Sequence, residues 1–203
     1  MIGRFEEAHV HITESCERLR DLGLLWQLGV QQLLHGHIEL FAGDPVASER
    51  HLRSAKESFI AIGDRWFLST ALVDLPRPVY AQGRYDDAWS LVASIDEVPA
   101  AADAEWRIKR QGVHACLLAR AGLFEEAEGR AREGVAVAAQ TDMLWFHADA
   151  LMDLVEVLRL AGRFREAAEA ASGALALYER KGIVPYARRA RGVLEGLRTG
   201  AAS

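Results

Sequence analysis

Histidine and glutamate side chains near the start of the chain have spacings that suggest metal binding. Glu6-x-x-His9 has the i, i+3 spacing that di-metal carboxylate sites use on their helices, and such sites need a second copy of this motif. No second Glu-x-x-His occurs in the sequence. His9-x-His11 and His35-x-His37 place their two rings about 200° apart on a helix, so neither pair can chelate one ion there. We therefore expect no metal site and interpret Glu6 as part of a solvated acidic face.

The sequence also lacks nucleophiles with partners at catalytic spacing. The only thiols, Cys16 and Cys116, form no Cys-x-x-Cys pair, and the i, i+2 spacing of His114 and Cys116 directs them to opposite sides of a helix. There is no Gly-x-Ser-x-Gly elbow, no His-Glu-x-x-His, no phosphate-binding glycine-lysine loop and no dinucleotide-binding turn. We expect no enzyme activity and no cofactor in this chain.

The elements that must position any site follow a repeat. Glycines at positions 3, 43, 83, 122 and 162 are separated by 40, 40, 39 and 40 residues, and four of them open a phrase of the type Gly-Arg-Phe-x-Glu-Ala. Tryptophans follow the first four glycines by 23 residues, at positions 26, 66, 106 and 145. Periods of about 20 to 50 residues are typical of solenoids, whose units bury their apolar faces against neighbours. The sequence therefore predicts an all-α solenoid of about five helical hairpins, in a single domain over residues 1–203.

Each repeat is predicted to contain two helices. Apolar residues recur at helical spacing between each tryptophan and the next glycine (helix A), and again after that glycine (helix B). A glycine that follows a helix can adopt the left-handed conformation that ends it, while Asp44, Asp64 and Asp103 are suited to cap the helices that follow them. We expect each repeat tryptophan to fill the joint between its helix A and the preceding helix B.

Three places depart from the regular repeat. Pro76 and Pro78 fall inside the third helix A, where we expect a kink or a break, and residues 95–102 predict a long loop. Helix B of the first repeat has no helix A before it, which indicates either a fragment of a longer array or a face covered by a second subunit, as in a homodimer. At the other end, residues 185–198 predict an amphipathic capping helix.

Two pairs of histidines share repeat positions. His35 and His114 lie two repeats apart, so we expect roughly 20 Å between them and interpret each as a partly buried replacement for leucine. His11 and His51 occupy equivalent positions on adjacent B helices and could approach each other, but two histidines do not complete a zinc site.

Composition narrows the classes of partner. The formal net charge of −5 and a pI near 5.8 argue against nucleic acid as a direct partner, because phosphate contacts need clustered Lys and Arg. No apolar run approaches the roughly 20 residues that span a bilayer, so we expect no membrane partner. Two isolated cysteines are typical of a protein in the reducing cytoplasm.

The repeated phrase resembles the second-helix half of a tetratricopeptide repeat (TPR). A small residue follows the Ala of the phrase by seven positions at Ser15, Ala55, Gly134 and Ala174, and the resemblance covers nearly the whole chain. The repeats are about six residues longer than the usual ~34, and only Gly36 keeps the glycine of the family's first helix. Long repeats of this kind look like the effector regions of bacterial LuxR-type regulators and ATPase/adenylate-cyclase fusion proteins. The resemblance implies a role in signalling or transcription regulation, with any catalytic parts outside this chain.

The same resemblance implies that helix A residues line a concave groove. They lie 13, 9, 6 and 2 positions before each phrase glycine, and the polar ones proposed to bind a partner are His37, Asp74, Arg77, Lys109, Arg120, Asp149, Asp153 and Glu156. The middle of this set is basic and its C-terminal end acidic, so the groove could hold an acidic peptide or a ligand carboxylate. The alternative is that these charges only solvate an exposed face.

We expect a non-catalytic interaction or effector module that binds a protein or peptide partner in this groove. The alternative is a small-molecule-sensing domain of a signalling ATPase, LuxR-type regulator or adenylate cyclase, with an effector bound between helices. A sensor needs an enclosed, largely apolar cavity of about 300–1,000 Å³, whereas a scaffold has an open groove.

Overall fold

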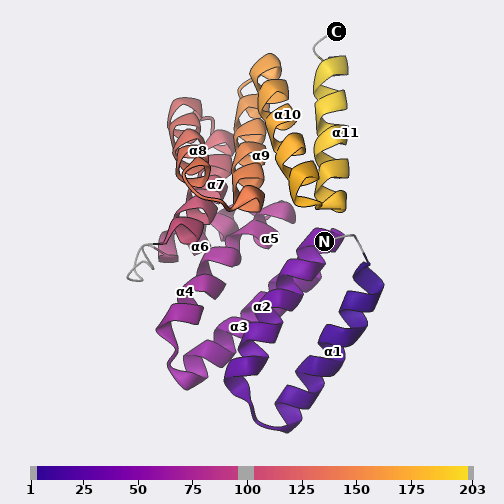
Figure 1. The fold of residues 1–203 in the computed structure, drawn as a ribbon. Helices are drawn as coiled ribbons and strands as arrows, with labels where there is room; N and C mark the ends of the chain where they lie inside the picture. The colour runs from indigo at the N-terminus through magenta and orange to yellow at the C-terminus, as the bar shows by residue number, and fades with distance from the viewer. Residues whose placement is uncertain (1–3, 96–102, 201–203) are drawn as a thin grey trace. The chain divides into compact units, whose positions relative to one another are not determined.

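The chain folds into helices joined by short turns. The computed structural model describes residues 4–95 and 103–200 (Figure 1). The helices are α1 (Phe5–Asp21), α2 (Leu25–Ala42), α3 (Pro45–Ile62), α4 (Arg65–Asp74), α5 (Pro76–Ala81), α6 (Tyr85–Ile95), α7 (Ala104–Arg120), α8 (Phe124–Ala139), α9 (Leu144–Leu160), α10 (Phe164–Lys181) and α11 (Val184–Gly200). These residues contain no β-strand, and none of their helices is both long and apolar enough to cross a membrane. The predicted all-α fold of helical hairpins is confirmed.

The turns between helices form as the sequence indicates. The phrase glycines at 43, 83, 122 and 162 all have φ between 74° and 91°, the left-handed region that favours glycine, while Gly3 lies outside the described residues. Asp44, Asp64 and Asp103 each accept a hydrogen bond from the backbone amide three residues later, at 2.9, 3.0 and 2.7 Å. These caps satisfy amides that have no partner within the helix, and they fix the starts of α3, α4 and α7.

The prolines interrupt the third helix A as expected. Helix α4 ends at Asp74 and α5 begins at Pro76, with both prolines buried. Leu75 keeps α-helical backbone angles (φ −59°, ψ −39°). The helix is interrupted in its backbone hydrogen bonds, because proline has no amide hydrogen to donate. The predicted loop at 95–102 lies outside the described residues apart from Ile95, the last residue of α6.

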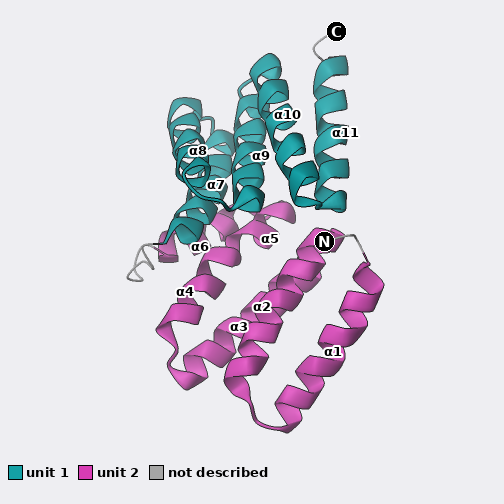
Figure 2. Ribbon diagram, viewed as in Figure 1, with its two compact units in different colours: residues 1–2, 102–203 teal, residues 3–101 magenta. Residues whose placement is uncertain are grey.

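Two compact units make up the fold (Figure 2). Unit 2 comprises residues 3–101 and unit 1 residues 1–2 and 102–203. In unit 2, α2 packs between α1 and α3, and its core includes Leu33, Leu52, Phe59 and Leu75. In unit 1, α9 packs against α7, α8 and α10, and α11 covers α10. Helix α11 contains the predicted capping helix, while the single domain over residues 1–203 stays a prediction.

An arginine of the repeated phrase holds neighbouring repeats together, a role the sequence did not reveal. Arg84 donates to Glu49 of the preceding repeat at 2.7 Å and also pairs with Asp87. Arg163 likewise pairs with Glu128 of the preceding repeat and with Glu166. In these two copies the phrase arginine therefore joins neighbouring repeats as well as standing at a helix start.

The expected burial of the tryptophans is wrong for two of them. Trp26 and Trp66 are 44% and 59% exposed, and Trp106 and Trp145 are partly buried. The Trp26 indole packs edge-on against Phe67, with ring centroids 5.2 Å apart, and donates to Asp64 Oδ2 at 3.0 Å. Trp26 thus contacts the next helix A through its indole N–H as well as its ring, and part of the ring stays in solvent.

Candidate functional site

Two of the predicted groove residues in unit 2 meet across adjacent repeats. His37 Nε2 on α2 lies 2.8 Å from Asp74 Oδ2 on α4. Asp74 is buried and His37 partly exposed, so the imidazole shields a carboxylate that would otherwise be costly to bury. Consecutive A helices therefore do present these positions to each other, as the repeat predicts.

The charged groove residues of unit 1 are bonded to one another or to neighbours. Arg120 on α7 donates to Glu156 on α9 at 2.7 Å, and Lys109 pairs with Glu105 at 2.6 Å. Burial raises the pKa of Glu156, but hydrogen bonds and charges from Arg159 and Arg120 outweigh it, so the pKa is lowered overall. A partner carboxylate would have to compete with these internal ion pairs.

The two aspartates of the predicted acidic end are also engaged. Asp149 accepts from the Trp145 indole at 2.5 Å and from the Tyr178 hydroxyl. Asp153 is buried, with its Oδ1 3.8 Å from the Cys116 thiol sulfur. The contacts of Asp149 and Asp153 named here lie inside unit 1.

Arg77 completes the predicted set. It is partly buried in α5 of unit 2, whereas Lys109 and Arg120 belong to α7 of unit 1. The central basic groove combines residues of both units, and it stays a prediction.

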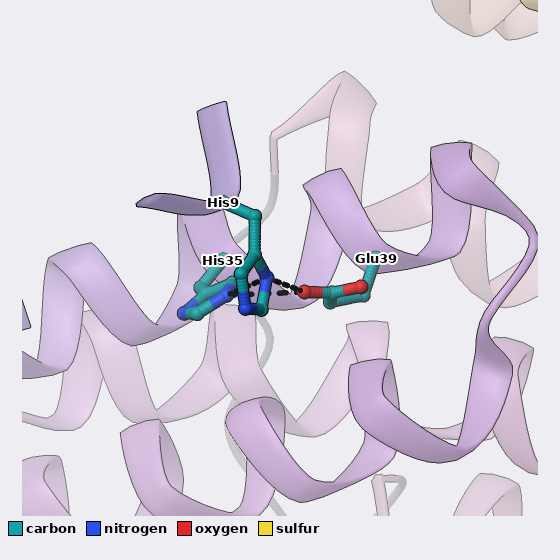
Figure 3. Close-up of side chains that lie close together, drawn as sticks. All are labelled: His9, His35 and Glu39. Atoms are coloured by element: carbon teal, nitrogen blue, oxygen red, sulfur yellow. Dashed lines mark hydrogen bonds and ion pairs between the residues drawn. The ribbon is translucent and has the colours of Figure 1, made fainter. Parts of the chain in front are cut away.

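A cluster of histidines and one glutamate lies at the contact of α1 with α2 (Figure 3). His9 Nδ1 is 2.6 Å from Glu39 Oε1, and His35 Nε2 is 3.1 Å from the same oxygen. The two ring nitrogens are themselves 3.3 Å apart, with the rings nearly edge to face. Two nitrogens and one oxygen that can each bind a metal ion thus converge on one point.

The cluster is open to solvent on one side only. The His9 side chain is 52% exposed, whereas those of His35 and Glu39 are 3% and 10% exposed. Burial lowers the pKa of His35, although the nearby Glu39 carboxylate opposes this shift.

His51 on α3 supports the buried histidine from its other face. Its ring stacks on that of His35, with centroids 3.6 Å apart and an interplanar angle of 19°. Burial, together with the neighbouring His35 and Arg50, lowers the pKa of His51 to about 4. Gln32 Oε1 lies 2.7 Å from its Nδ1 and therefore accepts the hydrogen that the neutral ring carries there.

Neither the i, i+2 spacings of the histidines nor their equivalent repeat positions indicate this cluster. The expectation that His9 and His11, and also His35 and His37, point apart fits the structure. In each pair one ring joins the cluster and the other does not: His11 is exposed, and His37 binds Asp74. His51 lies against His35 rather than approaching His11. The usable signal was His35-x-x-x-Glu39, an i, i+4 pair on the helix that packs against the helix of His9.

A surface depression of about 450 Å³ lies along α3. Its walls come from that single helix and comprise Val46, Glu49, Arg50, Arg53, Ser54 and Glu57, so the depression is open and not enclosed between helices. An apolar effector needs an enclosed, mostly apolar cavity, so this depression does not favour the sensor alternative.

The geometry defines a helical-repeat protein whose side-chain clusters lie at the contacts between repeats. A likeness to a solved structure agrees with this class: the chain is similar to the crystal structure of BtubC (BKLC) from P. vanneervenii, with a TM-score of 0.61. The match covers 98% of this chain and 93% of that chain at 16% sequence identity, which shows the fold alone. No family model matches the chain, and no curated protein matches it.

Proposed function

We propose that this chain is a non-catalytic, TPR-like interaction module that binds a short apolar segment of another protein. The observation that carries the proposal is an exposed aromatic patch at one end of unit 2. This apolar end consists of Leu22, Leu25, Trp26, Ile62 and Trp66, which are between 38% and 71% exposed. Exposed tryptophans are enriched where proteins bind one another, because the indole supplies a large apolar area at low entropic cost.

The residues of the apolar end belong to two neighbouring turns. Leu22, Leu25 and Trp26 flank the turn from α1 to α2, while Ile62 and Trp66 flank the turn from α3 to α4 (Figure 1). The hydrogen bond from the Trp26 indole to Asp64, which caps α4, brings the two turns together. The Trp26 indole therefore lies against the turn that Ile62 and Trp66 flank.

The size of the patch favours a short segment over a second copy of the chain. If a fully exposed tryptophan offers about 250 Å², exposures of 44% and 59% leave roughly 250 Å² of indole surface, and the three aliphatic residues add about as much. A stable dimer interface needs about 800 Å² from each partner. An amphipathic helix or extended peptide with a few apolar side chains fits the available area. The apolar end is also favoured over the groove because the groove charges described above already bind neighbouring residues.

Selection from a library of short displayed peptides against the full chain tests the proposal. Enriched peptides should carry aromatic or aliphatic residues and should bind the double variant Trp26→Ser/Trp66→Ser at least about tenfold more weakly, since central tryptophans dominate such interfaces. Val46→Ser is the matched control, because Val46 is 61% exposed in the first turn of α3, outside the patch. It should bind the peptides like the wild type.

Two results would contradict the proposal. Peptides that bind the double variant as tightly as the wild type would exclude the apolar end as the binding surface. A concentration-dependent dimer in sedimentation analysis that the double variant abolishes would show that a second copy, and not a different protein, covers the patch.

A further inference from the structure

The contact of α1 with α2 carries a second inference, which concerns a different part of unit 2 from the apolar end. We propose that His9 Nδ1, His35 Nε2 and Glu39 Oε1 form a binding site for one divalent transition-metal ion, with zinc the best fit, and that the ion links α1 to α2. The three atoms come from helices adjacent in the fold but separated in sequence by 26 residues between the histidines. Nothing in the proposed interaction function requires such a site.

The separations of the three atoms suit an ion of this size. The three atoms are 2.6, 3.1 and 3.3 Å apart, so a circle through them has a radius of about 1.75 Å. An ion about 2.05 Å from each atom would therefore lie about 1 Å outside the plane of the three atoms. Zinc binds histidine nitrogen and carboxylate oxygen at about 2.0–2.2 Å. In a regular tetrahedral site the ligand atoms would be about 3.3 Å apart. The distance from His9 to Glu39 would therefore have to lengthen by about 0.7 Å and that from His35 to Glu39 by about 0.2 Å.

The charge of Glu39 gives an independent reason for a cation. The residue is 8% exposed, and within residues 4–95 and 103–200 no Lys or Arg forms an ion pair with it. Buried carboxylates are costly unless they are paired with a cation or coordinate a metal. Its side-chain partners among the described residues are two imidazoles, so a divalent ion would supply a positive charge beside the buried carboxylate.

The donor set selects the class of metal. Two imidazole nitrogens and one carboxylate suit zinc and its neighbours in the first transition row, whereas magnesium and calcium prefer oxygen ligands alone. Three protein ligands leave a fourth position for water or for a group from outside, and the exposed His9 lies on the side open to solvent. Because His9 is the ligand on α1, occupancy of the site would fasten α1 to α2.

Titration of the metal-free full chain with zinc, followed by calorimetry, tests the site. We expect saturation at one ion per chain, no comparable binding of magnesium, and at least about tenfold weaker zinc binding in His9→Ala and in Glu39→Gln. Cobalt in place of zinc should give the intense visible bands of a four-coordinate site in the wild type only. Amide hydrogen exchange in α1 should slow when zinc is added.

His11→Ala is the matched control, since His11 is exposed on the same helix two residues from His9. It should leave zinc binding unchanged, and circular dichroism of each variant confirms that a loss of binding is not a loss of folding. Absence of saturable binding at one equivalent would overturn the proposal, as would an equal loss in His11→Ala and His9→Ala. Binding without slower exchange in α1 would refute the link between the helices.

Discussion

Replacement of Gly36 by alanine should destabilise unit 2, because this glycine permits the close approach of α2 to α3. A Cβ atom at position 36 would lie 2.7 Å from Leu52 Cγ, 2.9 Å from Leu52 Cδ2 and 3.2 Å from the Ser48 backbone oxygen. Carbon atoms in contact prefer about 3.5–4.0 Å, so the new methyl would intrude by about 0.8 Å or more. Leu52 is 1% exposed and packs in the core, and the Ser48 oxygen belongs to the backbone of α3, so neither can easily move away.

Two opposing effects set the size of the change in the free energy of unfolding. Alanine favours the helix over glycine by about 0.5–1 kcal/mol, whereas overpacking of a well-filled core costs about 1–3 kcal/mol. The clash here is with a branch carbon and with backbone, which places the cost toward the upper end of that range. We expect a net loss of about 1–2 kcal/mol in the free energy of unfolding, or a fall in Tm of roughly 4–16 °C for a unit of about 100 residues.

Gly129→Ala provides the matched control for this measurement. Gly129 lies within α8 without a positive φ, and a Cβ atom there would meet nothing within 4 Å, so alanine should stabilise the protein by about 0.5–1 kcal/mol. Urea unfolding followed by circular dichroism gives both values in one series. A Gly36→Ala variant as stable as the wild type would refute the claim that close packing of α2 on α3 requires glycine.

Three further variants test other contacts. Burial raises the pKa of Glu49, but hydrogen bonds and charges from its amide and guanidinium partners outweigh this and lower the pKa below its ordinary 4.5. Glu49→Gln should therefore destabilise the protein at neutral pH, and the difference in stability should vanish as the pH falls through the folded-state pKa. Acid unfolding of both proteins would show this. Tyr178→Phe removes the buried hydroxyl that donates to Asp149 and should lower the free energy of unfolding by about 1–3 kcal/mol in urea titrations; an unchanged midpoint would show that this bond contributes nothing. The double variant His35→Leu/Glu39→Leu replaces a buried polar pair with apolar residues. With a chelator present, it should be as stable as the wild type or more stable by about 1–4 kcal/mol. A marked loss of stability would mean that the cluster itself supports the fold.

Much of the architecture could be predicted from local rules. The positions of Gly43 and Gly83 predict helix ends because only glycine tolerates the left-handed backbone there, and Asp64 predicts a helix start because its side chain reaches the first free amides. Pro76 and Pro78 predict the break in the third helix A for an equally local reason, the missing amide hydrogen. Each of these signals acts within a few residues of itself, so the sequence contains all that is needed to interpret it.

The contacts and exposure of the tryptophans and of the phrase arginines depend on how distant parts of the sequence pack together. Spacing indicates that Trp26 stands at the start of helix A, but only the structure shows that it turns toward Asp64 and keeps 44% of its surface in solvent. Arg84 looks like an ordinary surface residue of the phrase until the packing of repeats brings Glu49 to it across 35 residues. A period fixes which positions are equivalent, and it does not determine which neighbour each side chain contacts.

The histidine cluster becomes easier to interpret once equivalent positions of helix A are compared by burial. His35 and Glu39 lie eight and four residues before their phrase glycine. At the second of these positions the later repeats bury Val79, Leu118 and Leu158, and at the first they have the buried Leu75 and Leu154 and the partly buried His114. Helix A of the second repeat thus has a carboxylate where the later repeats bury leucine or valine, and an imidazole where two of the three later repeats bury leucine. Such a pair contributes less to stability than the apolar residues it replaces, unless each polar atom is satisfied. Yet His35 Nδ1 is buried with no hydrogen-bond partner among the described residues, and no Lys or Arg pairs with Glu39 there. A fold that needed only an apolar core at this contact would be more stable with leucine, so the polar set supports the proposed metal site.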